Sequence, residues 1–223
     1  TIQAAVGAAT TLHGYYIVVD AGTYTENLTI DGKSGLVIQG PNAGLNDAKG
    51  TRVAEAIVVA ATNAPVFTIE ANVTSYTIDG LNIVGADYNS STNGRHIWAK
   101  GTTTQSNILN NKLELSSSET ATSKRYIWLG PATSGNSGAM YISGNVKYNY
   151  FKASGTGGKF MGIITQQSPL NLEISYNWFE DMKSQRNILV WHPSSTTVIK
   201  YNDLATTGDE EVVWLGGPGA QGG

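Results

Sequence analysis

One pattern of apolar and polar residues recurs through the middle and the end of the chain. An apolar residue is followed by two spacers, an Asn, one spacer and a large apolar residue, and successive Asn positions are 38, 28 and 25 residues apart. The four copies are Ile108–Leu113, Val146–Phe151, Ile174–Phe179 and Ile199–Leu204, and a fifth, Ile78–Ile83, lacks the Asn. Repeats of a few tens of residues are typical of solenoids.

Short runs of β-branched and aromatic residues lie between these copies and in phase with them, so each repeat carries at least two strands. Such strands also build antiparallel sandwiches. The recurrent Asn favours parallel coils instead, because equivalent side chains then stack about 4.8 Å apart and amides can hydrogen-bond along the stack. The predicted ladder is Asn111, Asn149, Asn177 and Asn202, and the predicted inner row is Leu113, Phe151, Phe179 and Leu204.

The two ends of the chain differ in composition. Ile2, Val6 and Ala9 fall on one helical face, so residues 1–12 are expected to form a helix that caps the first coil. The glycine-rich tail, 216–223, can form neither a helix nor a buried face. The last strand, Val212–Leu215, has no polar residue, so we expect its edge to be covered by another subunit unless the chain is a fragment.

The opening of the chain holds its most specific motifs. Thr1–Val6 reads TIQAAV, Ala21–Asn27 reads AGTYTEN and Gly40–Asn42 reads GPN. These motifs resemble the first coils of the pectate-lyase-like right-handed parallel β-helix superfamily, which includes pectin methylesterases. The resemblance implies an all-β, right-handed parallel β-helix with a short N-terminal capping helix. It also implies a polysaccharide lyase or pectin esterase, with calcium as a cofactor only in the lyase case. With the repeat, it predicts a single domain, residues 1–223, of about seven coils.

The residues that such catalysis needs are not apparent. The central coils hold no aspartate pair framed by Gln and Arg, and Glu180 and Asp181 have no evident metal-binding partners. Lys183 and Arg186 remain as candidates for a base or a substrate clamp. Arg186 would lie opposite Glu211 in the next coil, where an ion pair is the plainer interpretation. We therefore lean against an enzyme and expect neither a metal site nor a cofactor.

Tryptophans supply a candidate binding surface. Trp98 and Trp128 hold equivalent places in strands 30 residues apart, and alternation points both outward if the neighbouring isoleucines face the core. Outward indoles could stack on sugar rings or on another protein, or a neighbouring segment could cover them. Trp214 lies in the last strand, where we expect burial against a neighbouring subunit.

Composition narrows the choice of partners. Charged residues make up 14% of the chain and the net charge is −3, which excludes a strongly basic nucleic-acid binder. The absence of cysteine excludes disulfides and thiolate sites. No apolar run is long enough to span a membrane. Acceptor sequons at Asn27, Asn72 and Asn89 favour a glycosylated extracellular or cell-surface protein.

Together these observations favour a non-catalytic extracellular building block that self-associates head to tail into a filament or surface assembly. The enzyme implied by the resemblance is the first alternative. A glycan-binding module that uses Trp98 and Trp128 is the second.

Overall fold

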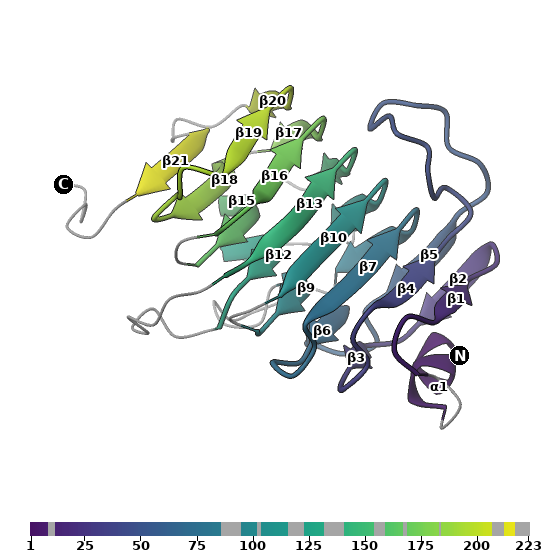
Figure 1. The fold of residues 1–223 in the computed structure, drawn as a ribbon. Coiled ribbons are helices and arrows are strands. Elements are labelled where there is room, and N and C mark those ends of the chain that lie inside the picture. Colours follow the sequence, from purple (N-terminus) through teal and green to yellow (C-terminus); the bar gives the residue numbers. More distant parts are fainter. Residues whose placement is uncertain are drawn as a thin grey trace.

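The computed structural model describes residues 1–8, 12–85, 95–101, 104–115, 123–131, 141–153, 159–166, 169–182, 184–206 and 212–216. Its strands form three parallel sheets of seven strands each (Figure 1). The chain adds one strand to every sheet before it returns to the first, so the molecule is a parallel β-helix of seven coils. It is right-handed, as parallel crossover connections are in nearly all proteins. The fold class predicted from the repeat is confirmed.

The strands of the three sheets follow one another in strict rotation. The first sheet contains β1 (Tyr16–Val18), β4 (Leu36–Gln39), β7 (Ser75–Asp79), β10 (Gln105–Leu109), β13 (Ser143–Lys147), β16 (Leu172–Ser175) and β19 (Val198–Lys200). The second contains β2 (Gly22–Thr25), β5 (Ala56–Val59), β8 (Asn82–Gly85), β11 (Lys112–Leu115), β14 (Tyr150–Lys152), β17 (Trp178–Met182) and β20 (Asp203–Thr206). The third contains β3 (Leu28–Ile30), β6 (Phe67–Ile69), β9 (Arg95–Ala99), β12 (Ser123–Leu129), β15 (Lys159–Thr165), β18 (Ser184–Trp191) and β21 (Val213–Gly216).

The repeated sequence pattern is a strand, a two-residue corner and a second strand. In one copy, Ile108 lies near the end of β10, Asn110 and Asn111 form the corner, and Leu113 points inward from β11. The first corner residue is left-handed in each of these coils, with φ of 53° at Asn110, 58° at Tyr148, 57° at Tyr176 and 54° at Tyr201. A left-handed non-glycine residue is unfavourable by itself, so the corner needs support from the ladder that follows it.

Alternation along the strands places one apolar row of each sheet inside the coil. Leu113, Phe151, Phe179 and Leu204 pair in register along the second sheet. The rings of Phe151 and Phe179 stack 4.4 Å apart with an interplanar angle of 5°. Because equivalent side chains lie directly above one another, the core is a set of continuous stacks.

One helix, α1 (Ile2–Gly7), closes the first coil. It is shorter than the segment 1–12 assigned to it from the sequence, because the backbone is already extended at Ala8 with ψ of 139°. Ile2 and Val6 pack into the core, whereas Ala9 lies outside the described residues. Figure 1 shows α1 at the N-terminal end and β21 at the opposite end. The glycine-rich tail beyond Gly216 also lies outside the described part.

Candidate functional site

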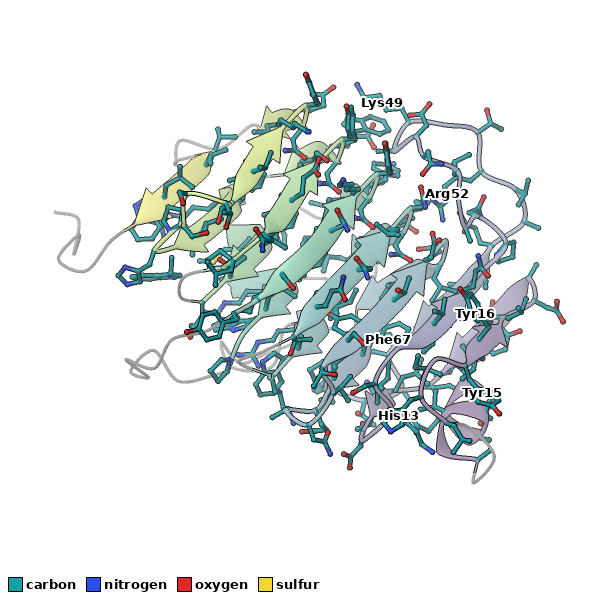
Figure 2. The ribbon with its side chains drawn as sticks, viewed as in Figure 1. His13, Tyr15, Tyr16, Lys49, Arg52 and Phe67 are labelled. Atoms are coloured by element: carbon teal, nitrogen blue, oxygen red, sulfur yellow. The ribbon has the colours of Figure 1, made fainter. Side chains whose placement is uncertain are left out.

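A long loop between β4 and β5, residues 40–55, runs along the corner between the first and second sheets (Figure 1). We call this loop the strap. It leaves the second coil, and Lys49 ion-pairs with Asp203 in the seventh coil, 154 residues later in the sequence. The Lys49 ammonium also lies 5.0 Å from the ring centre of Trp178 in the sixth coil. In Figure 2, Lys49 lies beside the later strands and Arg52 nearer the N-terminal ones.

Hydrogen bonds hold the strap to the corners beneath it. The backbone amide of Asn46 donates to Asn110 Oδ1 at 2.7 Å, and Arg52 Nη1 donates to the Asn110 carbonyl at 2.8 Å. A Cβ atom on Gly80, whose φ is +72°, would lie 2.0 Å from the strap nitrogen of Ala43. Only glycine allows this close approach. The strap therefore lies against the corner rather than standing out in solvent.

The four repeat asparagines form one hydrogen-bonded ladder at this corner. The backbone amide and the side-chain amide of each of the first three residues converge on Oδ1 of the Asn in the next coil, at 2.9 to 3.2 Å. The order of the ladder is Asn111, Asn149, Asn177 and Asn202. Each bond points toward the C-terminal end, so the ladder has a direction.

Tyrosines form a second ladder immediately outside the asparagines. The rings of Tyr148 and Tyr176 stack 5.1 Å apart, and those of Tyr176 and Tyr201 stack at the same separation. A cavity of about 190 Å³ lies between these rings, Trp178 and the strap. Each of these tyrosines directly precedes a ladder asparagine, so the Tyr-Asn pair in three copies of the repeat is the sequence signal for this second ladder.

The last coil ends both ladders and exposes core positions. Tyr201 is 70% exposed, and no described acceptor receives the backbone N–H of Tyr201 or of Asn202. Val213 and Leu215 pair with Ile188 and Val190, which are fully buried core residues, yet Val213 is 37% exposed and Leu215 57%. Within the described residues, nothing covers this edge as α1 covers the first coil.

The first coil is closed by specific polar contacts as well as by α1. The Glu26 carboxylate accepts the backbone N–H groups of Ile2 and Gln3 at the start of α1, at 2.8 and 2.9 Å. The Gln3 side chain donates to the carbonyl of Thr29 at 3.3 Å and accepts its N–H at 2.7 Å. One amide thus satisfies both backbone groups that Thr29, in edge strand β3, would offer to another strand.

The three candidate tryptophans lie in one row on the outer side of the third sheet. The row runs through Trp98, Trp128, Ile164, Leu189 and Trp214. Arginines cover its indoles, since Arg95 lies 4.2 Å from the Trp98 ring centre and 4.3 Å from that of Trp128. Trp128 is only 5% exposed, so its ring presents no free stacking face.

The other sequence candidates are distributed over the molecule. Arg186 lies 5.2 Å from the ring centre of Trp214, while Lys183 and Glu211 lie outside the described residues. Asn27 uses its amide fully, donating to two carbonyls and accepting two bonds from Thr62. Asn72 is exposed but bonds Asp31 and Gly32, and Asn89 lies outside the described part.

Ionisable groups near the last coil serve as cross-links between coils. Lys147 and Lys200 bind the two oxygens of Glu173 at 2.7 and 3.2 Å. The hydrogen bond from Lys147 is the main cause that lowers the pKa of Glu173 to about 2. The described ranges hold no group of three or more His, Asp or Glu arranged to bind a metal ion. They also contain no helix of the length and apolarity that crossing a membrane requires.

These features define a parallel β-helix with a capped first coil and a strap along one corner. Within the described residues, the edge of its last coil is uncovered. No protein-family model, curated protein or solved structure matches the chain. The fold is therefore established by the sheets themselves, and the family resemblance rests on the opening motifs.

Proposed function

We propose that this chain is a non-catalytic β-helix building block that associates with other protein through its last coil. The observation that carries the proposal is the exposure of Val213 and Leu215, which occupy core rows and are inward-facing. Covering apolar surface of this kind is the main driving force for association. The proposal includes an extracellular or cell-surface location and membership of the pectate-lyase-like superfamily, which the sequons and the opening motifs support.

Exposed large apolar side chains gather at both ends of the solenoid. The first coil and the turn before it present Leu12, Tyr15, Tyr16 and Val18, and the last coil presents Val198, Tyr201, Val213 and Leu215. Figure 2 shows Tyr15 and Tyr16 at the N-terminal end. This distribution supports the head-to-tail arrangement expected from the sequence, in which the last coil of one copy docks on the capped first coil of the next. Such unlike contacts generate open filaments when the rotation does not close.

Light scattering and sedimentation over a range of concentrations test the proposal. We expect the chain to form larger species as concentration rises, and the double variant Val213→Lys, Leu215→Lys to remain monomeric. Val53→Lys is the matched control, because Val53 is 61% exposed but lies on the strap. A clean monomer of the unmodified chain at every concentration would contradict the proposal, as would equal effects of the control and the double variant.

A further inference from the structure

We infer that the last coil is a binding site for a strand–corner–strand segment that carries an Asn at its corner. The inference rests on one part of the proposed function, association through the last coil, and assigns to that coil a partner other than the first coil of a second copy. It follows from the direction of the asparagine ladder, in which Asn111, Asn149 and Asn177 each donate two bonds to an oxygen in the next coil. Asn202 is the last of the four, and its side-chain amide bonds only the Ile174 carbonyl behind it among the described residues.

Comparison with the preceding coil shows what is missing. In the sixth coil, the N–H of Tyr176 donates to the Lys200 carbonyl at 3.4 Å, and the N–H and Nδ2 of Asn177 share Asn202 Oδ1. In the seventh coil, Nδ2 of Asn202 bonds backward to the Ile174 carbonyl at 3.0 Å. The remaining Nδ2 hydrogen and the backbone N–H of Asn202 have no acceptor among the described residues.

The partner must place a single oxygen where these two donors converge. A side-chain carboxamide does this in each of the three steps of the ladder. A carbonyl of an added strand could accept from Tyr201, as the carbonyl of Lys200 does from Tyr176. An aromatic residue before the Asn would continue the tyrosine stack on the exposed ring of Tyr201. The fitting segment therefore reads aromatic, Asn, any residue, large apolar.

The first coil of a second copy does not supply this segment. Its corner between β1 and β2 contains Val19, Asp20 and Ala21, without an Asn, and α1 packs across the end of the coil. The Gln3 side chain already occupies the backbone groups of Thr29 in β3. We therefore assign the partner as a β-helical coil with an Asn corner, which continues the interface between the sixth and seventh coils.

A peptide with the sequence of Leu172–Glu180, LEISYNWFE, is a suitable probe, because within the molecule this segment docks in the proposed way on β13 and β14, with Asn177 Oδ1 accepting both donors of Asn149. The matched control peptide, LEISYLWFE, replaces only the corner Asn by Leu. Both are titrated into the full chain to millimolar concentration, and binding is followed by NMR on the backbone amides of Tyr201 and Asn202. We expect the Asn peptide to bind at least about tenfold more tightly, since the control leaves the donors of Asn202 unpaired.

Three outcomes decide the inference. Tighter binding of the Asn peptide, with shifts at the Tyr201 and Asn202 amides, supports it. Equal binding of the two peptides overturns it, because strand edges alone would then suffice, and so does the absence of binding by either peptide. Self-association that Val213→Lys, Leu215→Lys abolishes, without preference for the Asn peptide, overturns the inference and leaves the proposed function standing.

Discussion

The first and last coils contribute residues to the same core rows, but these residues are buried in the first coil and exposed in the last. On the third sheet, Leu28 and Ile30 of the first coil are 0% exposed, whereas Val213 and Leu215 at the same positions of the last coil are 37% and 57% exposed. The difference comes from α1, which buries Ile2 and Val6 against the first coil. The repeated residues thus specify how coils stack, whereas covering a terminal coil requires additional capping residues such as those of α1.

The hydrogen bonds at the two ends differ in the same way. At the first coil, the side chain of Gln3 takes up the free backbone groups of Thr29. At the last coil, Asn202 retains donors with no acceptor in the described part of the chain. The ladder begins inside the solenoid, where Asn111 Oδ1 accepts the backbone N–H of Leu81, and it reaches only the last coil. The two ends therefore differ in their hydrogen-bonding groups as well as in α1.

The largest effect is expected from the aromatic stack of the second sheet. Phe179→Ala removes a fully buried ring and should lower the free energy of unfolding by about 3–5 kcal/mol. Leu204→Ala, at the same row position in the last coil, should cost less, because Leu204 is only partly buried. Chemical denaturation followed by circular dichroism measures both. Equal losses would show that the last coil is as well covered as the sixth.

A pair of valines compares the ends directly. Val6 in α1 is 2% exposed and Val213 in β21 is 37% exposed. Val6→Ala should therefore cost about 2 kcal/mol of unfolding free energy, and Val213→Ala clearly less. Thermal melts of dilute protein, where association is absent, make the comparison. A larger loss at Val213 would contradict the assignment of the open end.

Removing the polar cap tests the hydrogen bonds of the first coil. Gln3→Ala deletes both bonds to Thr29 and should destabilise the protein by about 1–2 kcal/mol. It should also increase the hydrogen-exchange rate of the Thr29 amide. Gln39→Ala is a matched control, because Gln39 lies in β4, next to edge strand β1, and forms no side-chain hydrogen bond in the described structure. An unchanged Thr29 exchange rate would show that α1 alone protects this edge.

Acid should weaken the link between the last coils. The pKa of Glu173 is lowered to about 2 by Lys147 and Ser175 and by Lys200. A lowered pKa stabilises the folded state above the unfolded pKa, and this contribution disappears as pH falls from about 4.5 to about 2. We expect Glu173→Gln to flatten the stability profile over that window by about 1 kcal/mol, since the carboxylate is partly exposed. Urea titrations at several pH values measure it, and parallel profiles would contradict the assignment.

The smallest global effect is expected at the strap. Lys49→Ala removes an ion pair whose side chains are about half exposed, so it should change the free energy of unfolding by less than about 1 kcal/mol. Its local effect should be larger, with faster hydrogen exchange in β17 and β20. Lys33→Ala serves as the control, because Lys33 lies in the turn between β3 and β4 and not on the strap. Unchanged exchange in β17 and β20 would show that the strap does not hold the last coils.

The sequence predicts the coils well because each copy of the repeat contains the residues that form its own corner. Asn177 and Phe179 are two residues apart, so a local pattern fixes both the turn and the inward side chain. The strap was not predicted, because the meeting of Lys49 and Asp203 across 154 residues leaves no local pattern. For Trp128 the sequence left exposure and burial both open, since alternation gives the direction of a side chain and not what lies over it.

The strap also sets an order of events in folding. Its anchor in the last coil follows Lys49 by 154 residues, which at about 5–20 residues per second means a delay of about 8–30 seconds during synthesis. The early coils can form from neighbours in sequence, but the contact between Lys49 and Asp203 must wait for the seventh coil. Such distant contacts slow folding, because the intervening chain must be ordered first. The strap can therefore bond the corners of the third and fourth coils first, through Arg52 and Asn46, and the Lys49 anchor forms only when the seventh coil is in place.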